Sequence, residues 1–337
     1  MKAIAFRKAS SLSANDCLVD VKRQPPVPGH RDLLVAVRAV SVNPVDTKVR
    51  MGSVSVPDDV DVLGWDVAGV VQAVGTEVSG FQAGDEVFYS GTITRSGGNA
   101  ELHTVDERLV GRKPSSLSFA EAAALPLTTL TAWQLLFHRL GVVPGKSPAA
   151  GTLLIVGGAG GVGSILIQLA SRLTGLTVIA TAARKESRNW CLSLGAHHVI
   201  DHSQSLIDEV AAIRASPITH IAALTHTAHH FRALVDILAP QGRIAVIDDH
   251  DSLDAAPLKT KSASLHWEMV FTRPLFATPD MIVQQRILNE VALLLDARAL
   301  RTTVTEQLGP LNAANLKRAH ALVERGHMLG KVVLAGF

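Results

Sequence analysis

Residues 152–170, TLLIVGGAGGVGSILIQLA, decide the fold of this chain. The apolar run 152–156 predicts a strand, and a helix is expected from about 162 to 173. The turn between them matches G-x-G-x-x-G through Gly158, Ala159, Gly160, Gly161, Val162 and Gly163. Its glycines permit a tight turn, close approach to a pyrophosphate and close helix–strand packing, while the helix N-terminus offers N–H groups to phosphates. The segment therefore predicts a dinucleotide-binding turn, the alternative being a glycine loop that serves packing alone.

Strands and helices alternate downstream of this turn. Further strands are expected at 177–182, 198–200, 220–224 and 243–248, and helices near 185–194, 205–215 and 228–238. Continuous apolar strands alternating with helices indicate a parallel sheet covered on both faces. A strand near 265–271 and a helix near 279–296 could complete a six-stranded sheet. The fold class expected is α/β, with a Rossmann doubly wound parallel sheet.

The first third of the chain predicts a second, β-rich domain. Short β-branched runs lie at 2–6, 33–40, 67–74, 86–89 and 100–105, separated by turn residues. No helix of useful length is expected before Ser118, where Ser118 and Glu121 form a capping box. A helix fits 128–140, and the tail adds a helix at 313–324 and a strand at 331–334.

Length and composition limit the function classes. The chain has 337 residues, which favours two domains, with 47% hydrophobic and 18% charged residues. A net charge of +2 predicts no nucleic-acid or anionic-membrane partner. Two cysteines and an N-terminus without a signal-peptide core fit a cytoplasmic protein. The uncharged stretch 147–171 is long enough to span a membrane, but its proline and six glycines favour the strand–turn–helix interpretation.

The second strand of the alternating region indicates which dinucleotide binds. An acid about 20 residues after the glycine turn normally holds the adenosine ribose 2′-hydroxyl. Residues 178–183, VIATAA, contain no acid, and Arg184 and Lys185 follow directly. A missing acid and added cations suit a 2′-phosphate, so NADPH is the expected cofactor. The alternative is a pair of solvated cations at a helix start.

Several motifs together resemble one superfamily. They are SVNPVDTKVR (41–50), VLGWDVAGVVQAVG (62–75), GDEV (84–87), SFAEAAALPLTTLTAWQLL (118–136), the glycine turn, LGAHHVID (194–201), APQGRIAVID (239–248) and GKVVL (330–334). The chain resembles the medium-chain dehydrogenase/reductase superfamily, and more narrowly its zinc-independent quinone oxidoreductase branch. The resemblance implies a GroES-like domain at 1–126, to which 299–337 returns, and a Rossmann domain at 127–298. It also implies a site in the interdomain cleft and a homodimer that buries the 265–271 edge strand.

This chain departs from the zinc-dependent relatives at the positions of their zinc ligands. Those relatives have cysteine where this chain has Asn43, and Gly-His-Glu where it has Gly64, Trp65 and Asp66. Neither asparagine nor tryptophan is a useful zinc ligand, and residues 91–99 contain no cysteine for a structural zinc. No metal is predicted. Six of the fourteen histidines form two groups, His197, His198 and His202 in one and His226, His229 and His230 in the other, and they are interpreted as surface and cofactor-edge residues.

Without a Lewis acid, hydride donation needs an acceptor that is already electron-poor, such as a quinone or an α,β-unsaturated carbonyl. By the resemblance, Asn43 faces the nicotinamide and can donate its amide N–H. Asp46 follows on the same loop and is a further catalytic candidate, the alternative being a structural or solvated charge. Trp65 is expected to give a planar substrate an apolar floor. Tyr89, the single tyrosine, is a candidate proton donor or a wall, and the wall is favoured.

The resemblance also implies cofactor contacts. Thr131 resembles a cofactor-contacting threonine, and Phe271 resembles a residue flanking the nicotinamide. His202 occupies the place of an aromatic residue near the 2′-phosphate. Lys331 matches a basic residue that reaches the pyrophosphate, the alternative being a structural salt bridge to Asp66.

The sequence thus predicts a cytoplasmic, zinc-free, NADPH-dependent reductase of quinones or enones, with a homodimer expected. The alternative from another class is a non-catalytic NADPH-binding sensor or structural protein on the same fold.

Overall fold

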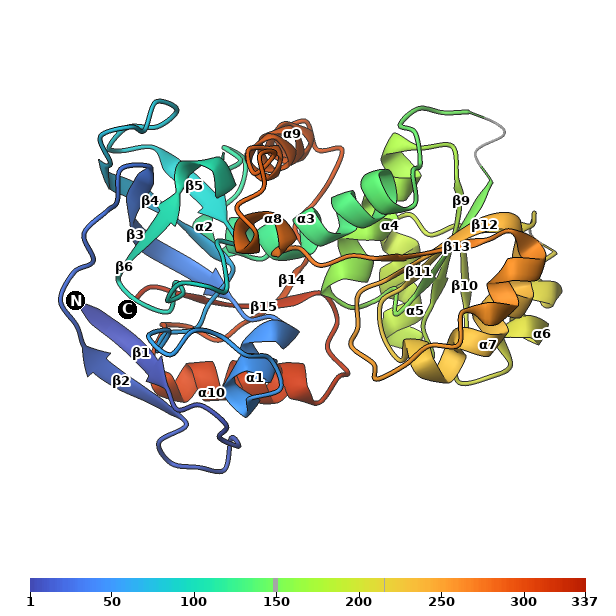
Figure 1. Cartoon of the computed structure of the whole chain (residues 1–337), viewed down its shortest axis with the longest axis horizontal. Coiled ribbons are helices and arrows are strands. Elements are labelled where there is room, and N and C mark those ends of the chain that lie inside the picture. Colours follow the sequence, from blue (N-terminus) through green and yellow to red (C-terminus); the bar gives the residue numbers. More distant parts are fainter. Residues whose placement is uncertain (148–150, 215) are drawn as a thin grey trace. The chain divides into compact units, whose positions relative to one another are not determined.

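The computed structural model describes residues 1–147, 151–214 and 216–337. The chain divides into two compact units (Figure 1). Unit 1 comprises Met1–Leu130 and Phe271–Phe337, and unit 2 comprises Thr131–Val270. The predicted α/β fold, with a Rossmann sheet and a second β-rich domain, is confirmed. Residues 148–150, which belong to the uncharged stretch 147–171, lie outside the described residues.

Unit 2 is built on a six-stranded parallel sheet with the order β10-β9-β8-β11-β12-β13. Its strands are β8 (Thr152–Val156), β9 (Thr177–Thr181), β10 (His198–Ile200), β11 (Ile218–Ala223), β12 (Leu238–Val246) and β13 (Ser264–Trp267). The chain order reverses direction between β8 and β11. In such open sheets ligands bind outside the carboxyl ends of the strands at this reversal, where the glycine turn follows β8.

Helices connect these strands as the alternation predicts. They are α4 (Gly161–Leu173), α5 (Lys185–Leu194), α6 (Leu206–Ala212), α7 (Thr227–Ile237) and η3 (Ala256–Lys261). One core cluster packs Leu154, Ile179 and Ile221 of the sheet against Phe231 and Leu234 of α7. The apolar side of α7 thereby fixes where its N-terminal turn lies at the sheet edge.

Unit 1 contains a seven-stranded sheet and a separate hairpin of two strands. The large sheet runs β14-β15-β3-β4-β5-β7, with β6 paired to β3, and the hairpin pairs β1 with β2. The strands are β1 (Lys2–Phe6), β2 (Leu18–Lys22), β3 (Asp32–Ser41), β4 (Val67–Val74), β5 (Glu86–Tyr89), β6 (Leu102–Asp106), β7 (Val110–Arg112), β14 (Val304–Gln307) and β15 (Lys331–Ala335). Antiparallel pairing of β15 with β3 brings the C-terminal strand next to the residue 41–43 loop.

The expectation of no helix before Ser118 is wrong, because α1 spans Pro44–Met51. Pro44 occupies the first turn, and the Asp46 carboxylate accepts the N–H of Asn43 at 2.7 Å. Gly52 ends the helix in the left-handed conformation, with φ of 80°. Eight residues give too few turns for the apolar period to be visible, so only the capping residues signal this helix.

Strands β2 and β7 were also not expected, and the expected 128–140 helix is in two parts. An α-helix, α3 (Pro126–Trp133), passes into a π-helical segment, η2 (Gln134–Arg139). Helix α3 crosses from unit 1 into unit 2 after Leu130, and η2 lies in unit 2. The other helices of unit 1 besides α1 are η1 (Glu107–Leu109), α2 (Phe119–Ala123), α8 (Thr272–Leu275), α9 (Val283–Asp296) and α10 (Ala313–Glu324).

The second domain boundary lies at 270/271 rather than at the expected 298/299, because α9 belongs to unit 1. The backbone N–H of Arg112 donates to Asn289 Oδ1 at 2.8 Å. Asp296 accepts the backbone N–H groups of Ser115 and Ser116 at 3.1 and 2.8 Å. These contacts join residues about 180 positions apart and hold α9 in unit 1, whereas the strand expected near 265–271, observed as β13, does complete the six-stranded sheet of unit 2.

A buried arginine joins α1 to α10. The side chain of Arg50 is fully buried and donates to the carbonyl of Ser10, to Glu324 and, at 3.4 Å, to His320 Nδ1. Burial and the adjacent guanidinium lower the pKa of His320 to about 3, so His320 is a neutral acceptor. Arg50 therefore fixes α10 against the loop that carries Asn43.

We expect Arg50→Ala to lower the free energy of unfolding by about 3 kcal/mol, because it removes one partner of a buried charge network. Arg318→Ala on the exposed face of α10 is the matched control and should change it by less than about 0.5 kcal/mol. Chemical denaturation followed by circular dichroism measures both. An equal loss in the two variants would contradict a specific role for Arg50.

Candidate cofactor and catalytic site

The glycine turn in unit 2 is tied to the neighbouring strand β9. The N–H of Gly157 donates to Thr181 Oγ1 at 3.0 Å, and the N–H of Gly158 donates to the Thr181 carbonyl at 3.2 Å. Helix α4 begins after Gly160, and no side chain caps its N-terminus. The first N–H groups of this helix thus keep their capacity to bind an anion.

The three glycines of the motif are required for different physical reasons. A Cβ at Gly158 would lie 2.7 Å from Ala180 Cβ, and one at Gly163 would lie 2.4 Å from the Gly157 carbonyl oxygen. Gly160 has an ordinary φ of −72°, and the nearest atom to its Cβ would be 3.7 Å away. Packing within the chain therefore explains Gly158 and Gly163, whereas Gly160 leaves open space. The turn fits a diphosphate that approaches the backbone there.

The other residues of the turn and the expected cations are accessible. Ala159, Gly161 and Val162 are partly exposed, and Arg184 and Lys185 are exposed where β9 leads into α5. The hydroxyl of Ser187 donates to the Arg184 carbonyl at 2.8 Å, which fixes the first turn of α5. Both cations therefore follow the strand next to the glycine turn.

Three further residues expected at the cofactor lie in different environments. Thr131 is buried in α3, and His202 follows β10 at the carboxyl edge of the unit 2 sheet. Phe271 is buried in unit 1, where its ring lies edge-on to Trp65 with centroids 6.3 Å apart. The structure thus brings together Phe271, which was expected to flank the nicotinamide, and Trp65, which was expected to give the substrate an apolar floor.

Asn43 is part of a buried polar network in unit 1. Its Nδ2 donates to Asp66 Oδ2 at 2.8 Å, and its Oδ1 accepts a hydrogen bond from Lys331. Lys331 Nζ also lies 3.1 Å from Asp66 Oδ2 and donates to the Val42 carbonyl at 2.9 Å. Of the two roles expected for Lys331, the structure shows the salt bridge to Asp66.

Asp46 belongs to the same buried region but bonds to backbone. Its Oδ2 accepts the N–H of Asn43 at 2.7 Å, and its Oδ1 accepts the N–H of Gly64 at 3.0 Å. Burial raises the pKa of Asp46 to about 7 and that of Asp66 above its ordinary value, and it lowers the pKa of Lys331. Asp46 therefore holds the 43–46 loop against the loop that carries Trp65.

Asp66 was expected only as the alternative partner of Lys331 and was not counted among the predicted site residues. Its Oδ1 accepts the N–H of Leu127 at 2.7 Å, while Oδ2 is shared by Asn43 and Lys331. One carboxylate thus joins three chain segments. The sequence signal was its position directly after Gly64 and Trp65, within a motif already singled out.

The indole of Trp65 is fixed by burial and by one hydrogen bond. Its side chain is fully buried, and Nε1 donates to the Thr92 carbonyl at 2.9 Å. Together with the edge-on ring of Phe271, this gives an apolar aromatic corner next to the Asn43 network. A corner of this kind suits a planar ring better than a flexible chain.

Tyr89 is buried and bonded to His103, at 2.9 Å from Nδ1. His103 Nε2 lies 2.9 Å from the Ser96 carbonyl, so Nε2 carries the proton and Nδ1 accepts from the tyrosine. Burial lowers the pKa of His103 to about 4 and raises the pKa of Tyr89 well above its ordinary value. The Tyr89 hydroxyl thus already donates its hydrogen bond to His103 within unit 1. This supports the interpretation of Tyr89 as a wall of the site rather than as a proton donor.

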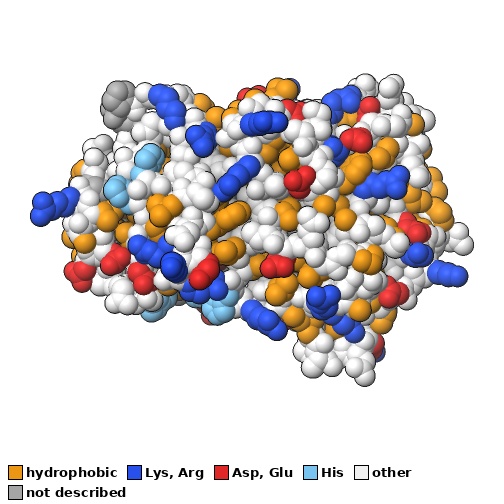
Figure 2. Space-filling view, turned by 180° about the vertical axis from the view of Figure 1, so that it is seen from behind, with side chains coloured by type: hydrophobic (Ala, Val, Ile, Leu, Met, Phe, Trp, Pro, Cys, Tyr) orange, Lys and Arg blue, Asp and Glu red, His pale blue; other side chains and the backbone are white. Residues whose placement is uncertain are grey.

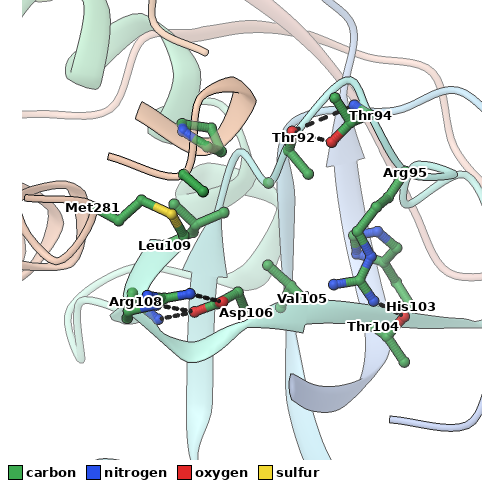
Figure 3. Close-up of a pocket in the computed structure, with 13 residues that line it drawn as sticks. Thr92, Thr94, Arg95, His103, Thr104, Val105, Asp106, Arg108, Leu109 and Met281 are labelled. Atoms are coloured by element: carbon green, nitrogen blue, oxygen red, sulfur yellow. Dashed lines mark hydrogen bonds and ion pairs between the residues drawn. The ribbon is translucent and has the colours of Figure 1, made fainter. Parts of the chain in front are cut away.

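His103 also lines a pocket of about 180 Å³ in unit 1 (Figure 3). Two arginines flank this pocket, and each is neutralised by a carboxylate. Arg95 donates to both oxygens of Asp32 at 2.9 and 2.8 Å, and Arg108 donates to both oxygens of Asp106 at 2.9 and 2.6 Å. The pocket therefore offers hydroxyl and apolar surface with little net charge, and Asn43 and Trp65 are not among its lining residues.

Charged side chains of both signs are distributed over the surface. On the face shown in Figure 2, Lys and Arg side chains are interspersed with Asp and Glu. Among residues 1–147, 151–214 and 216–337, no cluster of three or more His, Cys, Asp or Glu side chains is arranged to hold a metal ion. Within the same ranges, each helix is too short or too polar to cross a bilayer.

Known proteins resemble this chain along its whole length. Residues 29–132 match the alcohol dehydrogenase GroES-like domain, and residues 194–334 match the zinc-binding dehydrogenase family. A zinc-type alcohol dehydrogenase-like protein of Staphylococcus aureus is 36% identical over 336 residues, 99% of each chain. Human quinone oxidoreductase is 34% identical over 238 residues, 70% of each chain. A Rhizobium etli structure, provisionally described as a zinc-dependent alcohol dehydrogenase, is 54% identical with a TM-score of 0.95, covering 100% of this chain and 98% of the other.

The different roles of the glycines can be separated by mutation. We expect Gly163→Ala to lower the free energy of unfolding by about 1–3 kcal/mol, because its Cβ overlaps a backbone oxygen. Gly160→Ala should change stability by only about 0.5 kcal/mol but weaken dinucleotide binding at least about tenfold. Denaturation and cofactor fluorescence titration measure the two effects. Unchanged binding in Gly160→Ala would contradict the proposed diphosphate contact.

Proposed function

The chain belongs to the medium-chain dehydrogenase/reductase superfamily of oxidoreductases, and we propose that it is a zinc-independent, NADPH-dependent reductase of quinones or α,β-unsaturated carbonyls. The observation that carries this proposal is the hydrogen-bond network at Asn43. The residue standing where zinc-dependent relatives have a cysteine ligand is bonded to Asp66 and Lys331 instead. The indole of Trp65, where those relatives have histidine, is bonded to a backbone carbonyl.

The residues of unit 2 suit NADPH. The open space at Gly160 and the uncapped start of α4 would hold the diphosphate, and Arg184 and Lys185 would hold the 2′-phosphate. When bound, this cofactor supplies a hydride. The absence of an acid from residues 178–183 removes the group that would repel a phosphate there.

The residues of unit 1 suit an acceptor that spreads its own negative charge. Lys331 and Asp66 fix the amide plane of Asn43, which leaves one Nδ2 hydrogen bond direction for a substrate oxygen or the nicotinamide ribose. Trp65 and Phe271 would lie against a planar ring and exclude water. A quinone or enone needs only this positioning and one hydrogen bond, because conjugation delocalises the developing charge.

We further propose a cytoplasmic homodimer paired along β13. The side chains of Trp267 and Met269 are 55% and 45% exposed at this edge of the unit 2 sheet. An edge strand with unpaired backbone groups and exposed apolar side chains beside it invites pairing with a second copy. Both cysteines are buried and unpaired, which suits a reducing compartment.

Turnover separates the proposed enzyme from a non-catalytic NADPH-binding protein. Oxidation of NADPH should be followed by its absorbance with a simple quinone and, separately, with a simple enone. Turnover of either supports the enzyme, and the ratio of their kcat/KM values identifies the substrate class. Tight NADPH binding with no turnover of either would favour a sensor.

The first prediction from the proposed function concerns the zinc content of the protein. Purified protein should contain no stoichiometric zinc, and treatment with a chelator should leave kcat unchanged, because Asn43 and Trp65 replace two ligands. Elemental analysis by mass spectrometry provides the count. One tightly bound zinc per chain, lost together with activity, would overturn the proposed mechanism.

The second prediction concerns Asn43. Asn43→Ala should reduce kcat by up to about 10²–10³-fold if its amide stabilises developing charge, while the dissociation constant for NADPH changes little. Because Asn43 also supports Lys331, thermal unfolding must be measured in parallel and activity assayed well below the unfolding temperature. Tyr89→Phe is the control, since a wall residue should retain kcat. Full turnover in folded Asn43→Ala would remove Asn43 from the mechanism.

The third prediction concerns cofactor choice. Because a guanidinium can bind a phosphate bidentately, we expect NADPH to bind about ten- to a hundredfold tighter than NADH. Arg184→Ala should reduce this preference by weakening NADPH and sparing NADH, with Lys185 and His202 retaining part of it. Fluorescence titration at low salt measures both affinities. Equal affinities in the wild-type protein would contradict the assignment.

A further inference from the structure

Four histidines gather at the carboxyl edge of the unit 2 sheet. His202 follows β10, and His226, His229 and His230 lie at the start of α7. The rings of His202 and His230 are 6.4 Å apart, and those of His229 and His230 are 4.7 Å apart, both edge-on. His226 is close enough to lower the pKa of both His202 and His230. We refer to these four residues as the histidine quartet.

The quartet connects the ends of two strands that are not neighbours in the sheet. Strands β10 and β11 are separated by β9 and β8, which is three strand spacings or about 14 Å. The rings that follow them are nevertheless 6.4 Å apart, so the loop after β10 and the first turn of α7 converge. The two intervening strand ends carry Arg184 and the glycine turn. The quartet therefore lies beside the proposed binding groups for the adenosine phosphates.

Asp201 is an acidic neighbour of the quartet and raises the pKa of His202, against the larger effect of burial. Asp201 precedes His202, but its carboxylate accepts both the N–H and the hydroxyl of Ser203. From α6, the carboxylate of Glu209 accepts the Asp201 N–H. The Nδ1 atom of His202 is buried and has no hydrogen-bond partner.

The charges on the other neighbouring elements are also engaged. Arg188 of α5 donates to the Val199 carbonyl at 2.9 Å, and Arg232 of α7 pairs with Asp236. Asp248, after β12, accepts the backbone N–H of Thr227 at 3.0 Å. Apart from the Asp201 carboxylate beside His202, these neighbouring side chains therefore supply the quartet with little negative charge.

We propose that the histidine quartet is a proton-dependent contact for the 2′-phosphate, so that binding NADPH takes up protons that binding NADH does not. This inference rests on the proposed NADPH specificity. It assigns the quartet a role in cofactor discrimination beyond the fixed charge of Arg184, which stays protonated throughout the accessible pH range.

The direction of the pH effect follows from the charges. Burial keeps the pKa values of His202 and His230 below their ordinary value of 6.5. Neighbouring imidazoles lower both values further, while Asp201 partly offsets the effect of burial on His202, so both histidines are neutral at pH 7. A phosphate dianion favours the protonated form and raises these values. NADPH affinity should therefore increase as pH falls from about 8.5 to 6.5, by up to about tenfold per pH unit for each proton taken up.

The experiment is isothermal titration calorimetry of the full-length protein with NADPH and with NADH at pH 7. Two buffers of different ionisation enthalpy give the number of protons taken up. NADPH should take up about 0.5–1 proton more than NADH, and its advantage should grow about three- to tenfold between pH 8.5 and 6.5. The range stops at 6.5 because the phosphate itself titrates near a pKa of about 6.

Substitutions of single histidines show which side chains take up the protons on NADPH binding. His202→Gln and the exposed His226→Gln should each reduce the proton uptake and flatten the pH dependence. His198→Gln is the matched control, because His198 lies at the opposite end of β10. Loss of the pH dependence in His198→Gln as well, or its full retention in both quartet variants, would overturn the inference.

The outcomes also separate this inference from the proposed function. A constant NADPH preference at every pH, with equal proton uptake for both cofactors, would overturn the role of the quartet and leave NADPH specificity intact. Equal affinities for NADPH and NADH across the range would overturn the cofactor assignment itself.

Discussion

The structure of unit 1 depends on the burial of one ammonium group, that of Lys331. Only 2% of this residue is exposed, so its charge must be balanced by the protein. The partners are the Val42 carbonyl, Asn43 Oδ1 and Asp66 Oδ2, which lie 265–289 positions earlier in the chain. Docking of β15 onto β3 therefore completes the unit, because without it Asp66 would be buried without its cation.

The same interaction decides the chemistry open to Asn43. An asparagine whose oxygen faces an ammonium and whose nitrogen faces a carboxylate has one defined amide orientation. Asp46 then holds the backbone of Asn43 and of Gly64, so the neighbouring Trp65 is also fixed. With a pKa of about 7, Asp46 is partly protonated at neutral pH, which limits the negative charge in this dry region. The network thus acts as a rigid support rather than as a set of exposed acid–base groups.

Sequence reasoning succeeded where the signal is local and failed where it depends on distant contacts. The β4, β5 and β10 bounds and helix α10 were predicted to the residue, because each has its apolar period and its capping or turn residues within its own segment. Helix α1 was missed because eight residues show too little periodicity. The boundary at 270/271 and the choice between two roles for Lys331 both depend on partners about 180–290 positions away. No pattern within a short window encodes such pairings.

The two units meet different physical demands with different residues. Unit 2 presents backbone N–H groups, a missing Cβ at Gly160 and exposed cations, all of which suit a large, hydrated polyanion. Unit 1 presents side chains that are buried and already hydrogen-bonded, with an amide (Asn43) and an indole (Trp65) at the two positions compared with metal ligands. Such a surface positions a substrate but offers no strong electrophile of its own, because the ammonium of Lys331 is committed to Asp66. The proposed acceptor must therefore delocalise its own charge, which is the property that quinones and enones share.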